Sequence, residues 1–144
     1  DSEKLKLDLA KAIKYALIHD FVEVYAGDTY FYGNRKGKTA RERRAAARIK
    51  KEFPEFKELH RLIEAYESKR DRESRFVYAL DKIVPLYNVY LDNGRYWKKA
   101  DVSLKILFDK KKSKVAKSPE LVKYFDEMVA LLRKEEGRLF RKSS

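Results

Sequence analysis

The chain has 144 residues, which is long enough for one domain with a sizeable hydrophobic core. It contains no cysteine, so disulfides and thiolate metal sites are excluded and any metal must be held by nitrogen and oxygen ligands. Its 35 basic and 23 acidic residues give a net charge of +12, which favours anionic ligands, from nucleotides to nucleic acid. No apolar run is long enough to span a membrane, so no membrane partner and a cytoplasmic location are expected.

The spacing of apolar residues is helical nearly throughout and predicts an all-α fold with one domain over residues 1–144. The first predicted helix runs into His19, and a glycine-containing loop follows at about residues 27–38. Residues 39–42 have the spacing of a capping box for the next helix. Pro54 is well placed as the first residue of the helix after that one.

The second half of the chain continues the helical pattern. Asp71 is positioned to cap a long helix that contains Pro85, where a kink is expected, and that ends at Asn93 and Gly94. A shorter helix is predicted over about residues 103–110, and Ser118 is placed to cap a terminal helix. No internal repeat, domain-sized linker or β-type alternation is present, which supports a single helical domain.

The dipeptide His19-Asp20 ends the first predicted helix, and Glu23 follows it closely. Adjacent histidine and aspartate offer a neutral nitrogen and an anionic oxygen, which is a natural start for a divalent metal site. A continuous helix would place Glu23 on the same side as both residues. This pattern is typical of hydrolytic metal chemistry, although a surface or core histidine is the alternative interpretation of the dipeptide alone.

Three blocks of sequence carry a resemblance to a known family. They are Ala-Leu-Ile-His-Asp-Phe-Val-Glu-Val-Tyr-Ala-Gly-Asp-Thr at 16–29, a block with Tyr-Glu and Glu-Ser-Arg-Phe-Val-Tyr-Ala-Leu-Asp-Lys at 66–82, and Tyr-Leu-Asp-Asn-Gly-Arg-Tyr-Trp at 90–97. In order and spacing they resemble the HD-domain metal-dependent phosphohydrolases, specifically the branch that contains 5′-deoxynucleotidases. The resemblance implies a helical HD domain that hydrolyses (deoxy)nucleoside 5′-monophosphates to nucleoside and phosphate, and it implies a homodimer.

The resemblance also implies the site residues. His19, Asp20 and Asp81 match three of the four protein ligands of one divalent metal ion, for which Mn, Co, Fe and Zn all suit the ligand types. Glu23 and Asp28 match acidic positions that position or activate water and handle the substrate phosphate, whereas no substrate-binding residue is assigned. The family's remaining ligand is a histidine on a preceding helix, and no histidine precedes His19. We therefore expect the HD domain to be N-terminally incomplete, with one or more family helices missing.

Alternatives remain open for several features. HD proteins also hydrolyse nucleoside triphosphates, and a degenerate HD protein without metal is a further alternative. The basic run at residues 34–51 suits a non-catalytic helical module that binds nucleic acid, although a solvated helix face is preferred and a small nucleotide is the expected partner. His60 is interpreted as an exposed or rim residue and Lys82 as a solvent-facing lysine, while Tyr25 has an alternative role in stacking on a base.

Overall fold

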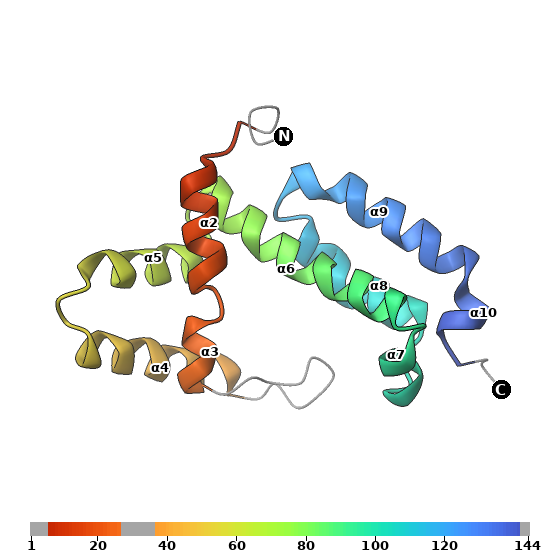
Figure 1. Cartoon of the computed structure of the whole chain (residues 1–144), viewed down its shortest axis with the longest axis horizontal. Helices are drawn as coiled ribbons and strands as arrows, with labels where there is room; N and C mark the ends of the chain where they lie inside the picture. Colours follow the sequence, from red (N-terminus) through yellow and green to blue (C-terminus); the bar gives the residue numbers. More distant parts are fainter. Residues whose placement is uncertain (1–5, 27–36, 142–144) are drawn as a thin grey trace. The chain divides into compact units, whose positions relative to one another are not determined.

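The computed structural model describes residues 6–26 and 37–141 (Figure 1). Helices and no strand occur within these ranges, which confirms the all-α prediction. No helix in the described ranges is long and apolar enough to cross a membrane. Contacts divide the chain into two compact units, residues 1–77 and 78–144, and helix α6 (Arg72–Leu91) contributes residues to both.

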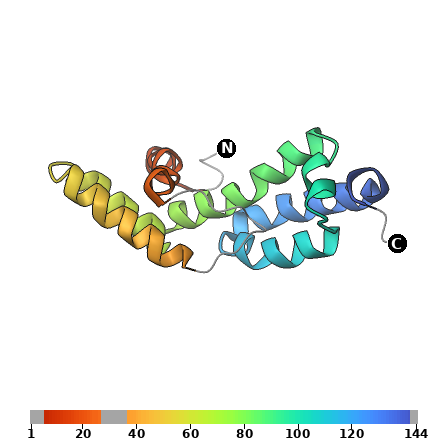
Figure 2. The same ribbon diagram turned by 90° about the horizontal axis from the view of Figure 1, so that it is seen from below.

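The first unit is built from α2 (Leu9–Ile18), α3 (Phe21–Ala26), α4 (Lys38–Glu52), α5 (Lys57–Ser68) and the start of α6. Helices α4 and α5 run side by side as an antiparallel pair (Figures 1 and 2). Helix α3 packs on α4, and α2 packs on α5. This pairing brings the predicted metal-site dipeptide, between α2 and α3, next to the α4–α5 pair.

Four buried aliphatic side chains form the core between α3, α4 and α5. They are Val22, Ala45, Ile49 and Ile63, and each is at most 5% exposed. Ala45 and Ile49 are four residues apart and therefore share one face of α4. Burial of each larger aliphatic side chain contributes roughly 1.5–3 kcal/mol, so this small cluster fixes the three helices to one another.

Asp71 caps α6, as the sequence predicts. Its Oδ1 accepts a hydrogen bond from the Ser74 N–H at 2.9 Å, while its Oδ2 accepts one from the Tyr15 hydroxyl at 2.8 Å and lies 2.6 Å from Lys11 Nζ. Burial alone would raise the pKa of Asp71, but the hydrogen bonds from Lys11, Ser74 and Tyr15 outweigh it and lower the pKa to about 2. One carboxylate thus joins α2 to the start of α6.

The second unit contains the rest of α6 and four further helices. These are α7 (Arg95–Lys99), α8 (Leu104–Val115), α9 (Pro119–Lys134) and α10 (Glu136–Leu139). Helix α8 packs on α9, while α10 contacts both α7 and α9. Trp97 is 2% exposed, and its ring stacks on Phe140 with centroids 4.9 Å apart. As predicted, Ser118 occupies the N-cap position of the long α9.

Gly94 ends the turn between α6 and α7, in agreement with the predicted helix end. Its φ of 69° is left-handed, and its N–H donates to the carbonyl of Val89 at 2.8 Å. A Cβ added at Gly94 would overlap the backbone carbonyl group of Leu139 in α10. Glycine is therefore required here both for the backbone conformation and for the close approach of α10.

Two helix starts differ from the predictions. Helix α4 begins at Lys38 with the left-handed Gly37 (φ 77°) as its N-cap, so Thr39 lies inside the first turn and the capping-box prediction is wrong. Pro54 lies in a turn, and α5 begins only at Lys57. Both errors are a few residues in size, and they leave the number and order of the surrounding helices unchanged.

Candidate metal site

His19 and Asp20 form the connection between α2 and α3. The N–H of His19 donates to the carbonyl of Tyr15 at 2.9 Å and closes α2, while the carbonyl of Asp20 accepts from the N–H groups of Glu23 at 2.9 Å and Val24 at 3.3 Å. The first helix therefore ends at His19, as predicted, and Glu23 belongs to a separate helix instead of a continuation of α2. Aspartate followed three residues later by glutamate is itself a helix-start signal, and it marks this break in the sequence.

The imidazole of His19 is held by its backbone and by one aromatic neighbour. Its Nδ1 lies 2.6 Å from the carbonyl oxygen of Ala16, which can only accept, so Nδ1 carries a proton and Nε2 is the nitrogen that can bind a metal when the ring is neutral. The Tyr66 ring packs against it edge-on, with centroids 6.1 Å apart. Nε2 faces Oδ1 of Asp20 at 3.2 Å. The nitrogen that a metal would need is therefore the one that points at the carboxylate.

The spacing of this pair fits a divalent metal. The lone pair of a neutral imidazole and a carboxylate oxygen can bind one cation together, whereas a protonated imidazole would donate to the carboxylate directly. Nitrogen and oxygen ligands lie about 2 Å from a metal such as zinc, so neighbouring ligand atoms are about 3 Å apart. The separation of 3.2 Å between His19 Nε2 and Asp20 Oδ1 matches this value. The Asp20 side chain is 69% exposed, which gives an ion access to the pair.

The other predicted site residues are placed differently. Glu23 lies half-buried in the first turn of α3, Asp28 lies outside the described residues, and Asp81 lies on α6 within the second unit. Within residues 6–26 and 37–141, no group of three or more histidine, cysteine, aspartate or glutamate side chains is arranged to hold a metal. The structure thus brings together His19 and Asp20, with Glu23 in the first turn of the next helix.

Asp81 is half-buried and ion-paired with the neighbouring Lys82. The ammonium of Lys82 also lies 5.0 Å from the centre of the Tyr78 ring, so the interpretation of Lys82 as solvent-facing is wrong. Its side chain is only 21% exposed. A cation that binds Asp81 must therefore compete with this lysine.

The backbone beside Asp81 has an unusual support. Pro85 has no N–H to donate to the carbonyl of Asp81, four residues earlier in α6, and its ring crowds that turn. Lys111 of α8 is 4% exposed, and its Nζ donates to the carbonyl of Lys82 at 2.8 Å. A buried ammonium thus supplies a donor to the turn that the proline weakens. The sequence gives no indication of this contact, because Lys111 sits in a run of lysines.

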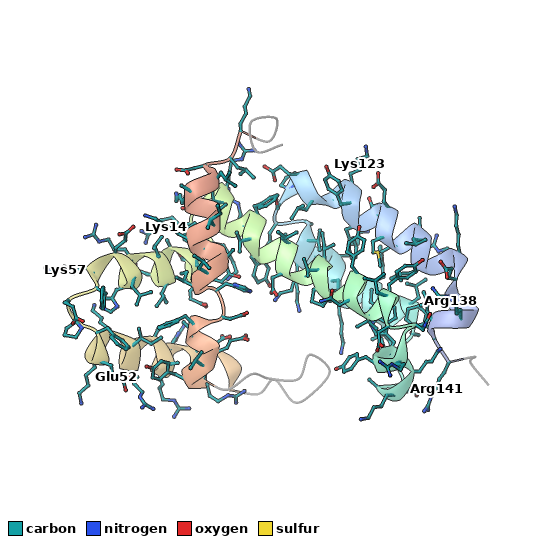
Figure 3. The ribbon with its side chains drawn as sticks, viewed as in Figure 1. Lys14, Glu52, Lys57, Lys123, Arg138 and Arg141 are labelled. Atoms are coloured by element: carbon teal, nitrogen blue, oxygen red, sulfur yellow. The ribbon has the colours of Figure 1, made fainter. Side chains whose placement is uncertain are left out.

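His60 and Tyr25 form hydrogen bonds that the sequence does not predict. His60 is half-buried, with Nε2 2.8 Å from the carbonyl oxygen of Phe53, and it lines a groove between α4 and α5. His60 is thus partly exposed at the edge of this groove, and its imidazole also bonds to the backbone of Phe53. Tyr25 donates its hydroxyl to Glu52, which is labelled in Figure 3, and the guanidinium of Arg48 covers its ring at 4.9 Å. Arg48, rather than a nucleotide base, occupies that face of the ring.

Comparisons with known proteins agree with this reading of the fold. The structure is similar to the crystal structure of a predicted metal-dependent phosphohydrolase from Magnetospirillum magnetotacticum MS-1, with a TM-score of 0.77 and 28% sequence identity. That similarity covers 94% of this chain and 69% of the other chain. A search of curated proteins finds no match. The family model described as the HD domain matches residues 1–122, a range that includes His19, Asp20 and Asp81. The chain therefore belongs to the HD-domain family.

Proposed function

We propose that this protein is a metal-dependent phosphohydrolase that converts (deoxy)nucleoside 5′-monophosphates to nucleoside and phosphate. Its HD domain and its similarity to a predicted metal-dependent phosphohydrolase support the general class of activity. The choice of nucleotide rests on the resemblance of the three sequence blocks to the 5′-deoxynucleotidase branch. The observation that carries the proposal is the His19–Asp20 pair, in which an imidazole nitrogen and a carboxylate oxygen face each other at 3.2 Å.

The residues divide into metal ligands and proton carriers. We assign His19, Asp20 and Asp81 as ligands of one divalent ion, with Mn, Co, Fe and Zn all suited to nitrogen and oxygen donors. When bound, such an ion supplies a Lewis acid that favours ionisation of water and offsets negative charge on phosphate. The Ala16 carbonyl and the Tyr66 ring hold the His19 imidazole in the orientation that this role requires.

Glu23 and Asp28 are assigned to proton transfer. The oxygen of the attacking water forms a new bond to phosphorus, and the bond from phosphorus to the 5′-oxygen of the nucleoside breaks. One carboxylate accepts the proton that the water loses, and a proton is delivered to the departing 5′-oxygen. Glu23 suits this role because it lies in the first turn of α3, three residues after Asp20.

A phosphate-release assay tests the proposal. The chain, extended by any residues that precede Asp1 in the natural protein, is incubated with nucleoside mono- and triphosphates and with each of Mn, Co, Fe and Zn. We expect release from deoxynucleoside 5′-monophosphates. Asp20→Ala and Asp81→Ala should each lower turnover at least about 100-fold, since loss of an outer partner of a metal ligand already costs about 10- to 100-fold.

Asp126→Ala is the matched control, because Asp126 is an exposed aspartate on α9 outside the assigned site. If both Asp20→Ala and Asp81→Ala kept full turnover, the metal-site assignment would be wrong. If phosphate were released only from nucleoside triphosphates, the substrate would be a triphosphate and the proposed monophosphate would be wrong. A protein that binds none of the four metals in a titration would instead be a degenerate HD domain.

A further inference from the structure

Tyr66 is a buried tyrosine of α5 that contacts two aromatic side chains of α2. Its ring centroid lies 6.1 Å from that of His19 and 6.0 Å from that of Tyr15. Tyr15 and His19 are four residues apart and therefore share one face of α2, so Tyr66 packs against both. Tyr66 is thus the side chain through which α5 reaches the first residue of the candidate metal site.

The Tyr66 ring is itself held in place. Tyr66 is 6% exposed and Tyr15 is 1% exposed. The Tyr15 hydroxyl donates to Asp71 at 2.8 Å, and burial together with this bond raises the pKa of Tyr15, so the hydroxyl keeps the proton that it donates. The ammonium of Lys69 lies 5.6 Å from the centre of the Tyr66 ring. The ring therefore cannot move away from His19 without disturbing the packing of α2 on α5.

The imidazole of His19 has two orientations that differ by a half-turn about its Cβ–Cγ bond. In the observed orientation, Nδ1 lies 2.6 Å from the carbonyl oxygen of Ala16 and Nε2 lies 3.2 Å from Oδ1 of Asp20. A half-turn would exchange each ring nitrogen with a ring carbon, so neither polar contact would survive. Only the observed orientation directs a nitrogen at the carboxylate of Asp20.

The bond to Ala16 constrains this choice only weakly. Ala16 is exposed, so water competes for its carbonyl oxygen and the net gain from the bond is small. Tyr66 constrains the imidazole by its shape, because its ring is inclined by 69° to the imidazole in an edge-to-face contact. The imidazole can make the half-turn only by sweeping through the space beside Tyr66. A buried ring thus restricts a histidine whose own side chain is 22% exposed.

We propose that Tyr66 is a positioning residue for His19, whose ring holds the imidazole in the orientation that directs Nε2 at Asp20. The benefit to metal binding rests on the proposed function, whereas the orientation itself requires no metal. A ligand that is oriented before the ion arrives loses less freedom when it binds. The role belongs to the ring and not to the hydroxyl, so phenylalanine should be able to replace Tyr66.

Nuclear magnetic resonance of the metal-free full chain tests the orientation. At alkaline pH, where histidine rings are neutral, the nitrogen-15 shifts of His19 distinguish a proton on Nδ1 from one on Nε2. We expect the wild type and Tyr66→Phe to keep the proton on Nδ1. In Tyr66→Leu the ring can turn over, so both tautomers should be populated. Identical His19 shifts in Tyr66→Leu and the wild type would overturn the proposal, as would a Tyr66→Phe variant that behaves like Tyr66→Leu.

Ile63→Ala is the matched control. Ile63 lies three residues before Tyr66 on α5 and is 5% exposed, so its truncation loosens the same helix but leaves the ring beside His19 in place. It should leave the His19 shifts unchanged, and equal changes in Ile63→Ala and Tyr66→Leu would overturn the proposal. If Tyr66→Leu did not fold, the wild type would still decide, since the proposal requires ring-to-ring nuclear Overhauser contacts between His19 and Tyr66. Their absence would overturn it.

Metal titration of the same variants separates this proposal from the proposed function. Calorimetry with each of Mn, Co, Fe and Zn alone should show an affinity that falls about tenfold in Tyr66→Leu and stays unchanged in Tyr66→Phe. Equal affinities in the wild type and Tyr66→Leu would overturn the role of Tyr66 in supporting the metal site. A wild type that bound none of the four metals would contradict the proposed function, and the spectra of the metal-free protein would still decide the orientation of His19.

Discussion

Asp71 and Asp20 are both aspartates that lie beside α2, but they have different surroundings. The Asp71 side chain is 24% exposed and accepts hydrogen bonds or ion pairs from Lys11, Tyr15 and Ser74. The Asp20 side chain is 69% exposed and faces the imidazole of His19. The Asp71 carboxylate therefore stabilises the fold, whereas the Asp20 carboxylate is accessible to a cation from solvent.

Replacement of Asp71 by asparagine tests the first of these roles. Because the folded-state pKa of about 2 lies below the ordinary 3.8, the carboxylate contributes its full stability above about pH 4 and loses it as the pH falls toward 2. A shift of this size corresponds to about 2 kcal/mol. Asp71→Asn should therefore lower the free energy of unfolding by about 2 kcal/mol at neutral pH and by much less near pH 2.

Urea unfolding of Asp71→Asn and of the exposed control Asp126→Asn, repeated over a series of pH values, measures this difference. An Asp71→Asn effect that did not change with pH would contradict the assignment of the stability to the ionised carboxylate. The control should remain within about 0.5 kcal/mol of the parent protein throughout.

The residue types reveal only part of the candidate site. His19 and Asp20 are recognisable from the sequence because adjacent nitrogen and oxygen donors are a chemical signal in themselves. The bond from Tyr25 to Glu52 joins residues 27 positions apart, and it exists only because α3 packs on α4. Such contacts depend on helix packing, which no local pattern of residues encodes.

Helix ends are predicted well where a side chain or a glycine determines them locally. Asp71 and Gly94 act as the sequence predicts, since one caps a helix with its carboxylate and the other adopts a left-handed conformation. Thr39 and Pro54 mislead, because each has the residue type of a helix start but lies near it rather than at it. The start of a separate helix at Phe21, directly after Asp20, is not predicted, because the apolar pattern continues through it.

Gly94 provides a test of the α6–α7 turn. Gly94→Ala should destabilise the protein by at least about 2 kcal/mol, since alanine disfavours a positive φ and its methyl group would overlap the Leu139 carbonyl. Gly137→Ala is the control, because nothing lies within 4 Å of its added Cβ. It should be neutral or stabilise α10 by up to about 1 kcal/mol. Thermal unfolding of both variants measures the contrast, and equal effects would refute the proposed overlap.

Lys111 and Pro85 should act together in α6. Lys111→Met leaves the carbonyl of Lys82 without this donor and should cost about 1–3 kcal/mol, whereas Lys112→Met, at an exposed neighbour, should stay within about 0.5 kcal/mol. Pro85→Ala restores the N–H that pairs with the Asp81 carbonyl and removes the ring that crowds this turn, so the neighbouring Lys82 carbonyl should depend less on Lys111 and the cost of Lys111→Met should fall in that background. A double-mutant cycle of urea unfolding measures the coupling. Additive effects would show that lysine and proline act independently.

At the scale of the whole molecule, the expected homodimer stays a prediction. Exposed apolar residues of α6 are the surface at which we test it. Leu80, Val84, Tyr87 and Leu91 follow helical spacing, and each is at least 37% exposed. Val84→Glu should convert a dimer to a monomer, because a buried unpaired charge is costly at an interface. Light scattering after size-exclusion chromatography measures the mass. Lys123→Glu, at an exposed residue of α9, is the control. A wild-type protein that is a monomer would contradict the proposed interface. So would a Val84→Glu variant that forms a dimer as stable as that of Lys123→Glu.

Trp97 is the chain's single tryptophan, and it lies buried against Phe140 in the second unit. Its fluorescence therefore reports the melting of that unit alone, whereas far-UV circular dichroism records the helices of both. Coincident melting curves from the two signals would show that the chain unfolds as one cooperative unit, and separate curves would show two. His19 and Asp20 belong to one unit and Asp81 to the other. If a divalent ion binds all three, its addition should raise the melting temperatures reported by both signals.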